Sequence, residues 1–182
     1  MDVTINPRGV LQINNARIIF KNFEGRATDF NEEGRRNFSL IISGGTFDDG
    51  RPGSKPVVLN AEEMAEALMA ETNEFGDGWN VKIKPPYAEG EEPFMHMKVN
   101  VSTRRGCPPM YVNSAGNVRR LDEDTMGMID HIAIRNVNLD IRPYDDKKGG
   151  RSFRSAYLDS IEVIQEIDRF AARYAEEEYP EE

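Results

Sequence analysis

The sequence contains a single cysteine, Cys107, among 182 residues, which excludes an internal disulfide framework. No apolar run approaches the roughly 20 residues that a membrane-spanning helix requires. The first ten residues also lack the basic start and apolar centre of a signal peptide. The length fits one domain with appendages. We therefore expect one soluble domain in the cytoplasm.

Sequence signatures of enzymes are also scarce. There is no glycine-rich phosphate-binding loop, no CxxC and no HExxH motif. The two histidines, His96 and His131, are isolated in sequence, so a metal site would need carboxylates from elsewhere. Cys107 lies in a basic loop where arginines would lower the pKa of its thiol, but no histidine partner can be assigned. We expect a binding protein without catalytic residues, metal or cofactor.

The negative charge is concentrated near the end of the chain. The formal net charge is −9. Residues 162–182 contain eight acidic and two basic residues, a net −6, which leaves −3 for the rest. The segment Pro93–Leu121 has five lysines and arginines and no acid. Acidity of the whole chain therefore does not argue against a nucleic-acid partner.

Alternating apolar and polar residues predict several short strands. In the first, residues 11–23, the alternation places Ala16, Ile18 and Phe20 on one face and Arg17, Lys21 and Phe23 on the other. The residues 110–118 suggest a hairpin. The last long strand has a phase slip that predicts a bulge. The predicted strands cover 11–23, 37–42, 79–84, 94–101, 110–113, the segment around Val118, 136–144 and 152–164.

Helical signals are fewer. Asn60 and Glu63 form a capping box before an amphipathic segment of about three turns. Asp122 is expected to cap a short helix, and residues 43–56 form a glycine-rich connection without regular structure. A final helix is expected over Ile164, Ile167, Phe170, Ala171 and Tyr174.

This order of elements predicts a mainly β fold. The best fit is a five-stranded oligonucleotide/oligosaccharide-binding (OB) barrel with extra strands, a hairpin, an amphipathic helix between strands and a C-terminal helix. We expect the domain to span residues 1–165, and residues 166–182 to form the C-terminal helix and acidic tail.

Basic and aromatic residues are interleaved on the faces predicted to point away from the core. Cations can track phosphates while flat rings stack on bases, which is how sequence-tolerant binders hold single strands. For any single residue, a plain solvated surface is the alternative explanation. The candidate nucleic-acid-binding residues are Arg17, Lys21, Phe23, Lys82, Phe94, Lys98, Arg104, Arg105, Tyr111 and Arg142.

The acidic tail has a function in this interpretation. A tethered polyanion can occupy a cationic groove when nucleic acid is absent, at an effective concentration near the millimolar range. When nucleic acid displaces it, the tail can recruit partner proteins. The tail residues expected to do so are Glu176, Glu177, Glu178, Glu181 and Glu182.

Four segments, residues 13–42, 77–86, 136–145 and 156–174, resemble bacteriophage-encoded single-stranded DNA-binding proteins with an OB fold. The resemblance implies coating of single-stranded DNA in phage replication, recombination or repair, and an acidic C-terminus that contacts replication or recombination proteins. In some such proteins the tail ends in an aromatic residue, whereas here Tyr179 is followed by three more residues.

Two other classes of function stay open. The net charge of −9 also suits a phage structural or host-inhibitor protein that mimics DNA and binds none. The other class is an enzyme such as a nuclease, which would cleave DNA in the presence of magnesium. The sequence leaves open a homodimer, the length of strand covered, and the choice between DNA and RNA.

Overall fold

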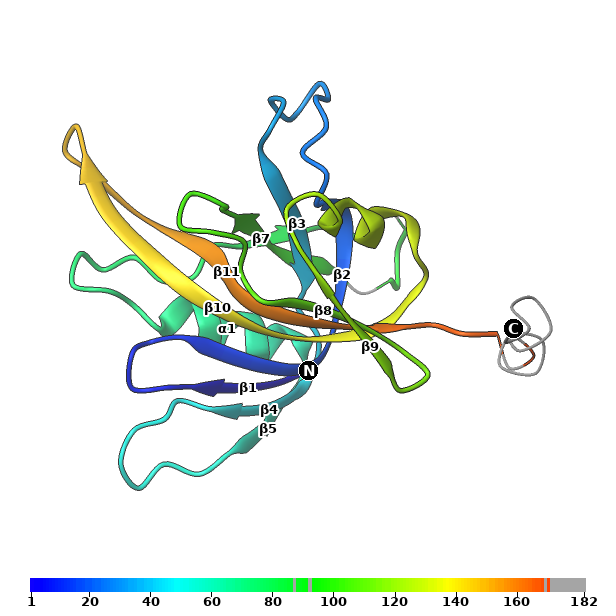
Figure 1. The fold of residues 1–182 in the computed structure, drawn as a ribbon. Helices are drawn as coiled ribbons and strands as arrows, with labels where there is room; N and C mark the ends of the chain where they lie inside the picture. The colour runs from blue at the N-terminus through cyan, green and yellow to red at the C-terminus, as the bar shows by residue number, and fades with distance from the viewer. Residues whose placement is uncertain (87, 92, 169, 171–182) are drawn as a thin grey trace, which may run out of the picture.

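The computed structural model describes residues 1–86, 88–91, 93–168 and 170, and strands dominate it (Figure 1). The strands are β1 (Asp2–Ile5), β2 (Leu11–Asn22), β3 (Arg36–Ile41), β4 (Gly45–Asp48), β5 (Val57–Leu59), β6 (Val81–Lys84), β7 (Phe94–Val101), β8 (Met110–Ser114), β9 (Asn117–Leu121), β10 (Ile134–Lys148) and β11 (Arg151–Gln165). The helices of this described part are the α-helix α1 (Ala61–Ala70) and the 3-10 helix η1 (Met126–His131). Neither is long and apolar enough to cross a membrane.

Five strands close into a barrel. β2 pairs with β3, β3 with β7, β7 with β11, β11 with β10, and β10 returns to β2. Every pair is antiparallel except β7 with β11, which is parallel. This is the five-stranded barrel of the OB fold, so the predicted fold class is confirmed. Its interior is filled by fully buried side chains that include Leu11, Ile13, Leu40, Met97 and Ile141.

A bulge in β2 overturns part of the predicted alternation. Between Ile19 and Asn22, β2 has one residue more than the facing stretch of β3. An extra residue reverses which face the following side chains occupy. Phe20, expected in the core, is 56% exposed with a left-handed φ of 54°. Phe23, expected on the outside, is fully buried and stacks on Phe38 with ring centres 5.1 Å apart.

The prediction that the glycine-rich segment 43–56 has no regular structure is wrong, because the segment contains β4. β4 runs parallel to β1, and β5 pairs with its other edge. A Cβ atom on Gly45 would overlap the carbonyl oxygen of Met1, so this approach requires glycine. The Asp2 carboxylate accepts hydrogen bonds from the Thr46 amide and hydroxyl, at 3.0 and 2.9 Å. These contacts extend the sheet beyond the barrel.

The capping box predicted for α1 is present. The Asn60 side chain accepts a hydrogen bond from the Glu63 amide at 2.8 Å, and Glu63 accepts one from the Asn60 amide at 3.1 Å. The apolar face of α1 buries Met64, Ala65 and Leu68 and packs against β4, β5 and β6.

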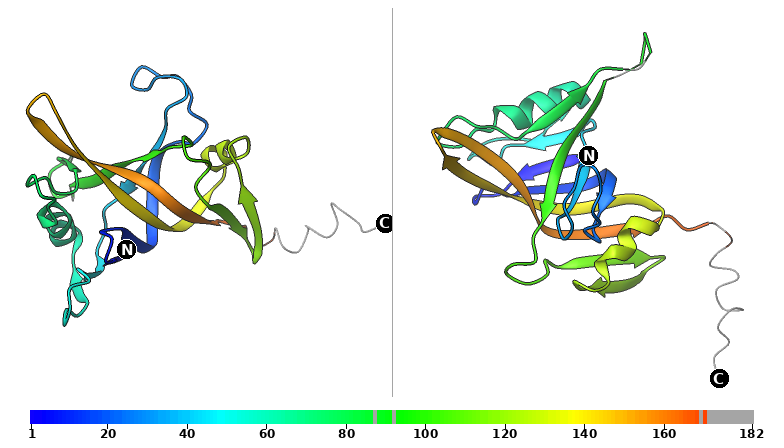
Figure 2. Two further views of the ribbon diagram at one scale, coloured as in Figure 1. Left: turned by 60° about the vertical axis from the view of Figure 1, so that its left-hand side comes forward. Right: turned by 90° about the horizontal axis from the view of Figure 1, so that it is seen from above.

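The predicted hairpin is also present, since β8 and β9 pair around a turn at 115–116. It lies at the end of the barrel opposite α1 (Figure 2). The helix expected after Asp122 is a 3-10 helix that begins at Met126. Asp122 is not its N-cap, because its carboxylate instead accepts from Thr125 in the preceding turn, at 2.9 Å to both the amide and the hydroxyl.

The bulge expected in the last strand is confirmed. Asp140 faces Ser160 while Ile141 faces Leu158, so Asp159 is an extra residue of β11. The extra residue keeps buried residues on the inside of the barrel on both sides of position 159.

The predicted C-terminal helix is wrong at its start, because Ile164 lies in β11 and Ile167 lies in no regular element. The remaining helix residues fall mostly outside the described residues, as does the tail. The predicted residues outside are Ala171, Tyr174, Glu176, Glu177, Glu178, Glu181 and Glu182.

Candidate nucleic-acid interface

β7 carries a row of side chains on the outer face of the barrel. Phe94, His96, Lys98 and Asn100 alternate with buried neighbours, as the sequence predicted. Because alternate residues of a strand share one face, these four line one surface about 20 Å long. The inward residues are Met95, Met97, Val99 and Val101.

An aromatic cluster lies at one end of this row. The ring of Phe20 makes edge contacts with Phe94 and His96, with centroid distances of 6.4 and 5.8 Å. Phe94 stacks on His96 at 5.2 Å and 28°. The ammonium group of Lys84 lies 5.5 Å from the centre of the Phe20 ring. Two phenylalanine rings and a cation are thus held together at the surface.

Further cations surround the cluster. Arg17 faces Ile41 of β3, Ile41 faces His96 of β7, and His96 faces Lys82 of β6. Arg17, Lys82 and Lys98 are all exposed. Three of the predicted cations therefore lie within a few strand spacings of Phe94.

A hollow of about 840 Å³ opens between the β7–β8 loop and the β10–β11 hairpin, which extends beyond the barrel at the upper left of Figure 1. The Arg142 guanidinium lies 5.0 Å from the centre of the Tyr157 ring, and Tyr144 makes an edge contact with that ring at 5.9 Å. The cations lining the hollow are Arg104, Arg105, Arg142 and Lys148. Among the described lining residues the one acid is Asp159, 4.0 Å from Arg142.

The hollow and the row on β7 are continuous. Asn100 pairs with Tyr157 of β11, which in turn faces Arg142 of β10. We call the combined surface the basic-aromatic track. It consists of Arg17, Phe20, Lys82, Lys84, Phe94, Lys98, Arg104, Arg105, Arg142, Tyr144, Lys148 and Tyr157.

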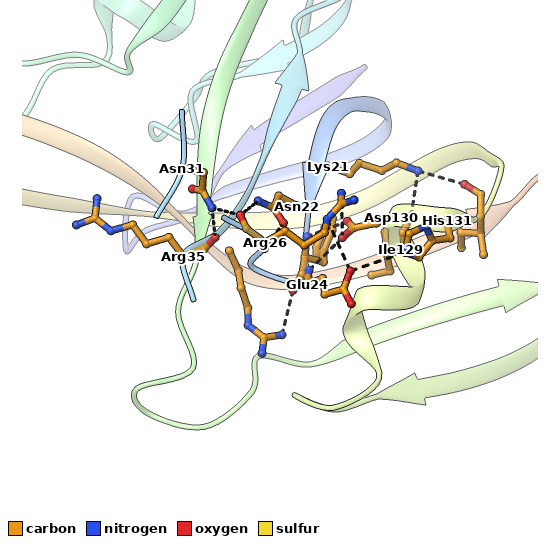
Figure 3. A network of polar contacts seen from close by, with 12 residues as sticks. Lys21, Asn22, Glu24, Arg26, Asn31, Arg35, Ile129, Asp130 and His131 are labelled. Atoms are coloured by element: carbon orange, nitrogen blue, oxygen red, sulfur yellow. Dashed lines mark hydrogen bonds and ion pairs between the residues drawn. The ribbon is translucent and has the colours of Figure 1, made fainter. Parts of the chain in front are cut away.

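Two of the predicted residues do not contribute to the track. Lys21 donates hydrogen bonds to the carbonyl oxygens of Ile129 and Ile132, at 2.9 and 3.1 Å (Figure 3). Burial lowers the pKa of its ammonium group, with a smaller opposing effect of Asp130. Phe23 is inside the barrel because of the β2 bulge, so its ring cannot stack on a base. Both predictions placed structural side chains at the surface.

The network that holds Lys21 also fixes the loop between β2 and β3. The Asp130 carboxylate accepts hydrogen bonds from the amides of Phe23 and Glu24, at 2.8 and 3.1 Å (Figure 3). Further along, the side-chain amide of Asn31 donates to three carbonyl oxygens of the same loop. At the tip of this ordered loop the Phe30 side chain is 99% exposed.

Tyr111 lies elsewhere. It faces Arg120 within the β8–β9 hairpin, whose guanidinium is 5.8 Å from its ring centre. It also faces Glu162 of β11 and lines a separate hollow with Asn138 and Asp140. The structure therefore does not bring Tyr111 into the track. The carboxylates near Tyr111 would also repel phosphate.

A family model described as "Putative phage ssDNA-binding domain" matches residues 2–48 and 56–182. The chain belongs to this family. No curated protein matches its sequence.

The fold of this chain is similar to solved structures of one phage protein. The single-stranded DNA-binding protein of bacteriophage Enc34 has a TM-score of 0.52 and 15% identity, over 93% of this chain and 88% of that one. Its C-terminal truncation has a TM-score of 0.50 and 12% identity, over 92% of each chain. Its complex with single-stranded DNA has a TM-score of 0.48 and 15% identity, over 93% of each.

Cys107 differs from its expected chemistry. Burial, with Asp122 as the next cause, raises the pKa of its thiol, whereas the sequence suggested that arginines would lower it. The thiol donates to the Pro108 carbonyl oxygen at 3.3 Å. Within the described residues, no group of three or more His, Cys, Asp or Glu side chains is arranged to hold a metal ion.

Sequence reasoning missed three surface aromatics of this phage domain: Phe20, Phe30 and Tyr157. No local signal in the sequence indicates that Phe20 is exposed, because no particular residue type marks a bulge. Phe30 could have been found, since it lies alone in a polar loop between two glycines and has no alternating neighbours to pack with. Tyr157 depended on where the predicted bulge of β11 would fall.

Proposed function

We propose that this protein coats single-stranded DNA without strong sequence preference, and that the strand lies along the basic-aromatic track. The observation that supports this most directly is the continuity of the track from the β7 row to the hollow. Cations and rings occur together both in the β7 row and in the hollow, so phosphates and bases of one strand can both find partners. Membership of the phage family supports the same ligand.

The groups on the track explain why sequence would matter little. Lysines and arginines bind phosphates, which are the same in every nucleotide. Rings such as Phe20, Phe94 and Tyr144 stack on any base, because every base has a π face. The protein would act as a binding protein rather than an enzyme, and incubation with DNA and magnesium should yield no cleavage products.

The decisive experiment is a titration of the full chain into a fluorescently labelled oligo-dT, followed by anisotropy at several salt concentrations. We expect binding that weakens steeply with salt, because bound cations release counterions from the strand. A double charge reversal, K82E with K98E, should abolish binding at salt concentrations where the wild type binds. K55E is a control for charge reversal away from the track, since Lys55 is also exposed but lies in the β4–β5 connection. Absence of binding at low salt, or equal losses in both variants, would refute the proposal.

The acidic tail and its partners form a further part of the proposal. The charge segregation between residues 162–182 and the rest of the chain supports a tail that competes with DNA for the track and contacts replication or recombination proteins in the host cytoplasm. Deletion of residues 175–182 should tighten oligo-dT binding. A DNA mimic would bind no DNA with or without these residues. Light scattering of the free chain would decide whether it forms a homodimer.

A further inference from the structure

One buried polar atom next to the track, in a side chain between Phe94 and Lys98 on β7, has no partner. His96 is 6% exposed, and its Nε2 atom is buried and makes no hydrogen bond to any of the described residues. Its other ring nitrogen, Nδ1, lies 3.2 Å from the Ser39 hydroxyl. Buried polar atoms are nearly always hydrogen-bonded, because an unsatisfied one loses its water without compensation. An unpaired nitrogen within the aromatic cluster of a candidate binding surface points to a ligand.

Phe20, whose backbone is strained, packs against the His96 ring. The Phe20 ring meets the His96 ring edge-on at 5.8 Å, and more than half of its own surface is exposed. The backbone of Phe20 is left-handed, with φ 54°, a conformation that residues other than glycine rarely adopt. Strain of this kind collects at binding sites and moving segments. The contacts of the Phe20 ring are with Phe94, His96 and Lys84 on the outer face of the barrel, so the ring can turn away without disturbing the core.

The charges that act on His96 are all positive. Lys84 and Lys82 of β6 lower the pKa of the ring, after burial, which is the largest cause. Besides these lysines, Phe20 of β2 and Ser39 and Ile41 of β3 approach it from other elements, and none of the three titrates. Along β7, Lys98 is two residues away on the same face. The imidazole is therefore neutral at pH 7 in the free protein.

We propose that His96 binds a DNA phosphate through Nε2 once Phe20 turns aside to stack on a base, and that the ring takes up a proton from solvent as the strand binds. This inference rests on the proposed function of the track. A phosphate between Lys82 and Lys84 supplies the negative charge that this position lacks. The neutral ring avoids placing a buried cation beside these two exposed lysines in the free protein, and protonation gives Nε2 a charged donor in the complex.

The consequence is binding that depends on pH. A phosphate next to His96 favours the imidazolium ion and so raises the pKa of the ring in the complex above its value in the free protein. Linkage is reciprocal, so each proton taken up strengthens DNA binding as the pH falls. Between the two pKa values the affinity should rise by up to about tenfold per pH unit.

The experiment measures oligo-dT affinity of the full chain from pH 8 to pH 5.5 at constant ionic strength. The wild type should bind more tightly toward low pH, and His96→Phe, which keeps a ring against Phe94 but cannot titrate, should lose that dependence. His131→Gln is the control, because His131 is the other histidine and lies near Glu24, away from the track. It should keep the wild-type dependence.

A second measurement needs no variant. NMR titration of the His96 ring should show its pKa moving up when oligo-dT is added. Salt-sensitive binding with an unchanged His96 pKa, or with the same pH dependence in His96→Phe, would overturn this inference alone. Absence of binding at every pH would overturn the proposed function and this inference together.

Discussion

Replacement of Phe20 by alanine and by glycine separates backbone strain from ring contacts. The ring is 56% exposed, so its removal should lose about 1 kcal/mol of burial. Loss of the edge contacts with Phe94 and His96 should cost about 1 kcal/mol more. Phe20→Ala should therefore destabilise the fold by roughly 2 kcal/mol.

Glycine should behave better than alanine at this position. A non-glycine residue pays about 1–2 kcal/mol for a left-handed φ such as the 54° found here, and glycine does not. Glycine in turn adds about 0.5–1 kcal/mol of chain entropy to the unfolded state. Phe20→Gly should thus be more stable than Phe20→Ala by about 0.5–1 kcal/mol. Both variants should lose a similar amount of oligo-dT affinity, about 1–3 kcal/mol for one stacking ring.

Urea unfolding followed by the fluorescence of Trp79, the single tryptophan and 2% exposed, measures these differences. Gln12 provides the control, since it is exposed within β2 and has no left-handed φ. There glycine should be the less stable substitution. If Phe20→Gly were less stable than Phe20→Ala, as at position 12, the strain at Phe20 would be refuted.

Three other predictions use the same assays. Lys82→Gln should lower the slope of log K against log salt for oligo-dT by about 0.7. Lys21→Met should leave this slope unchanged and destabilise the fold by about 1–3 kcal/mol, because two partly buried carbonyl oxygens lose their donor. The pKa of His96 is lower in the folded chain than in the unfolded chain, where it is near 6.5. The protein should therefore lose stability as the pH falls from about 6.5 through the folded pKa, because the unfolded chain then binds the proton more tightly. In urea unfolding between pH 7 and 5, His96→Phe should lack this loss. Phe30→Ser should leave the urea midpoint unchanged, because the ring is 99% exposed, and should weaken oligo-dT binding if the loop reaches the strand; unchanged affinity would place Phe30 outside the interface.

Local patterns in the sequence were sufficient where neighbouring residues decide the structure. The alternation of β7, the capping box of α1 and the turn of the β8–β9 hairpin all depend on residues within a few positions of one another. The outward row on β7 and its cations followed directly from this, and so did the barrel as the best arrangement of many short strands.

Pairing between distant segments could not be predicted in the same way. β4 exists because Val3 of β1 faces Phe47 in a parallel pair, which no local pattern of residues 43–56 indicates. The hollow likewise forms because Asn100 and Tyr157 meet where β7 and β11 run in parallel. Arg104, Arg105 and Arg142 were identified as cations, but their common position depends on this packing of distant segments.

The β2 bulge shows how one extra residue can build a binding surface. If β2 alternated regularly, Phe20 would lie inside the barrel and Phe23 outside, as the sequence alone predicts. The bulge exchanges the two rings: Phe23 stacks on Phe38 in the core, and Phe20 covers His96 at the surface. The core keeps one phenylalanine at this position in either arrangement, so the exchange costs little burial. The bulge also adds an exposed ring, on a residue with a left-handed backbone, beside Lys84 and on the face of the barrel where the cations gather.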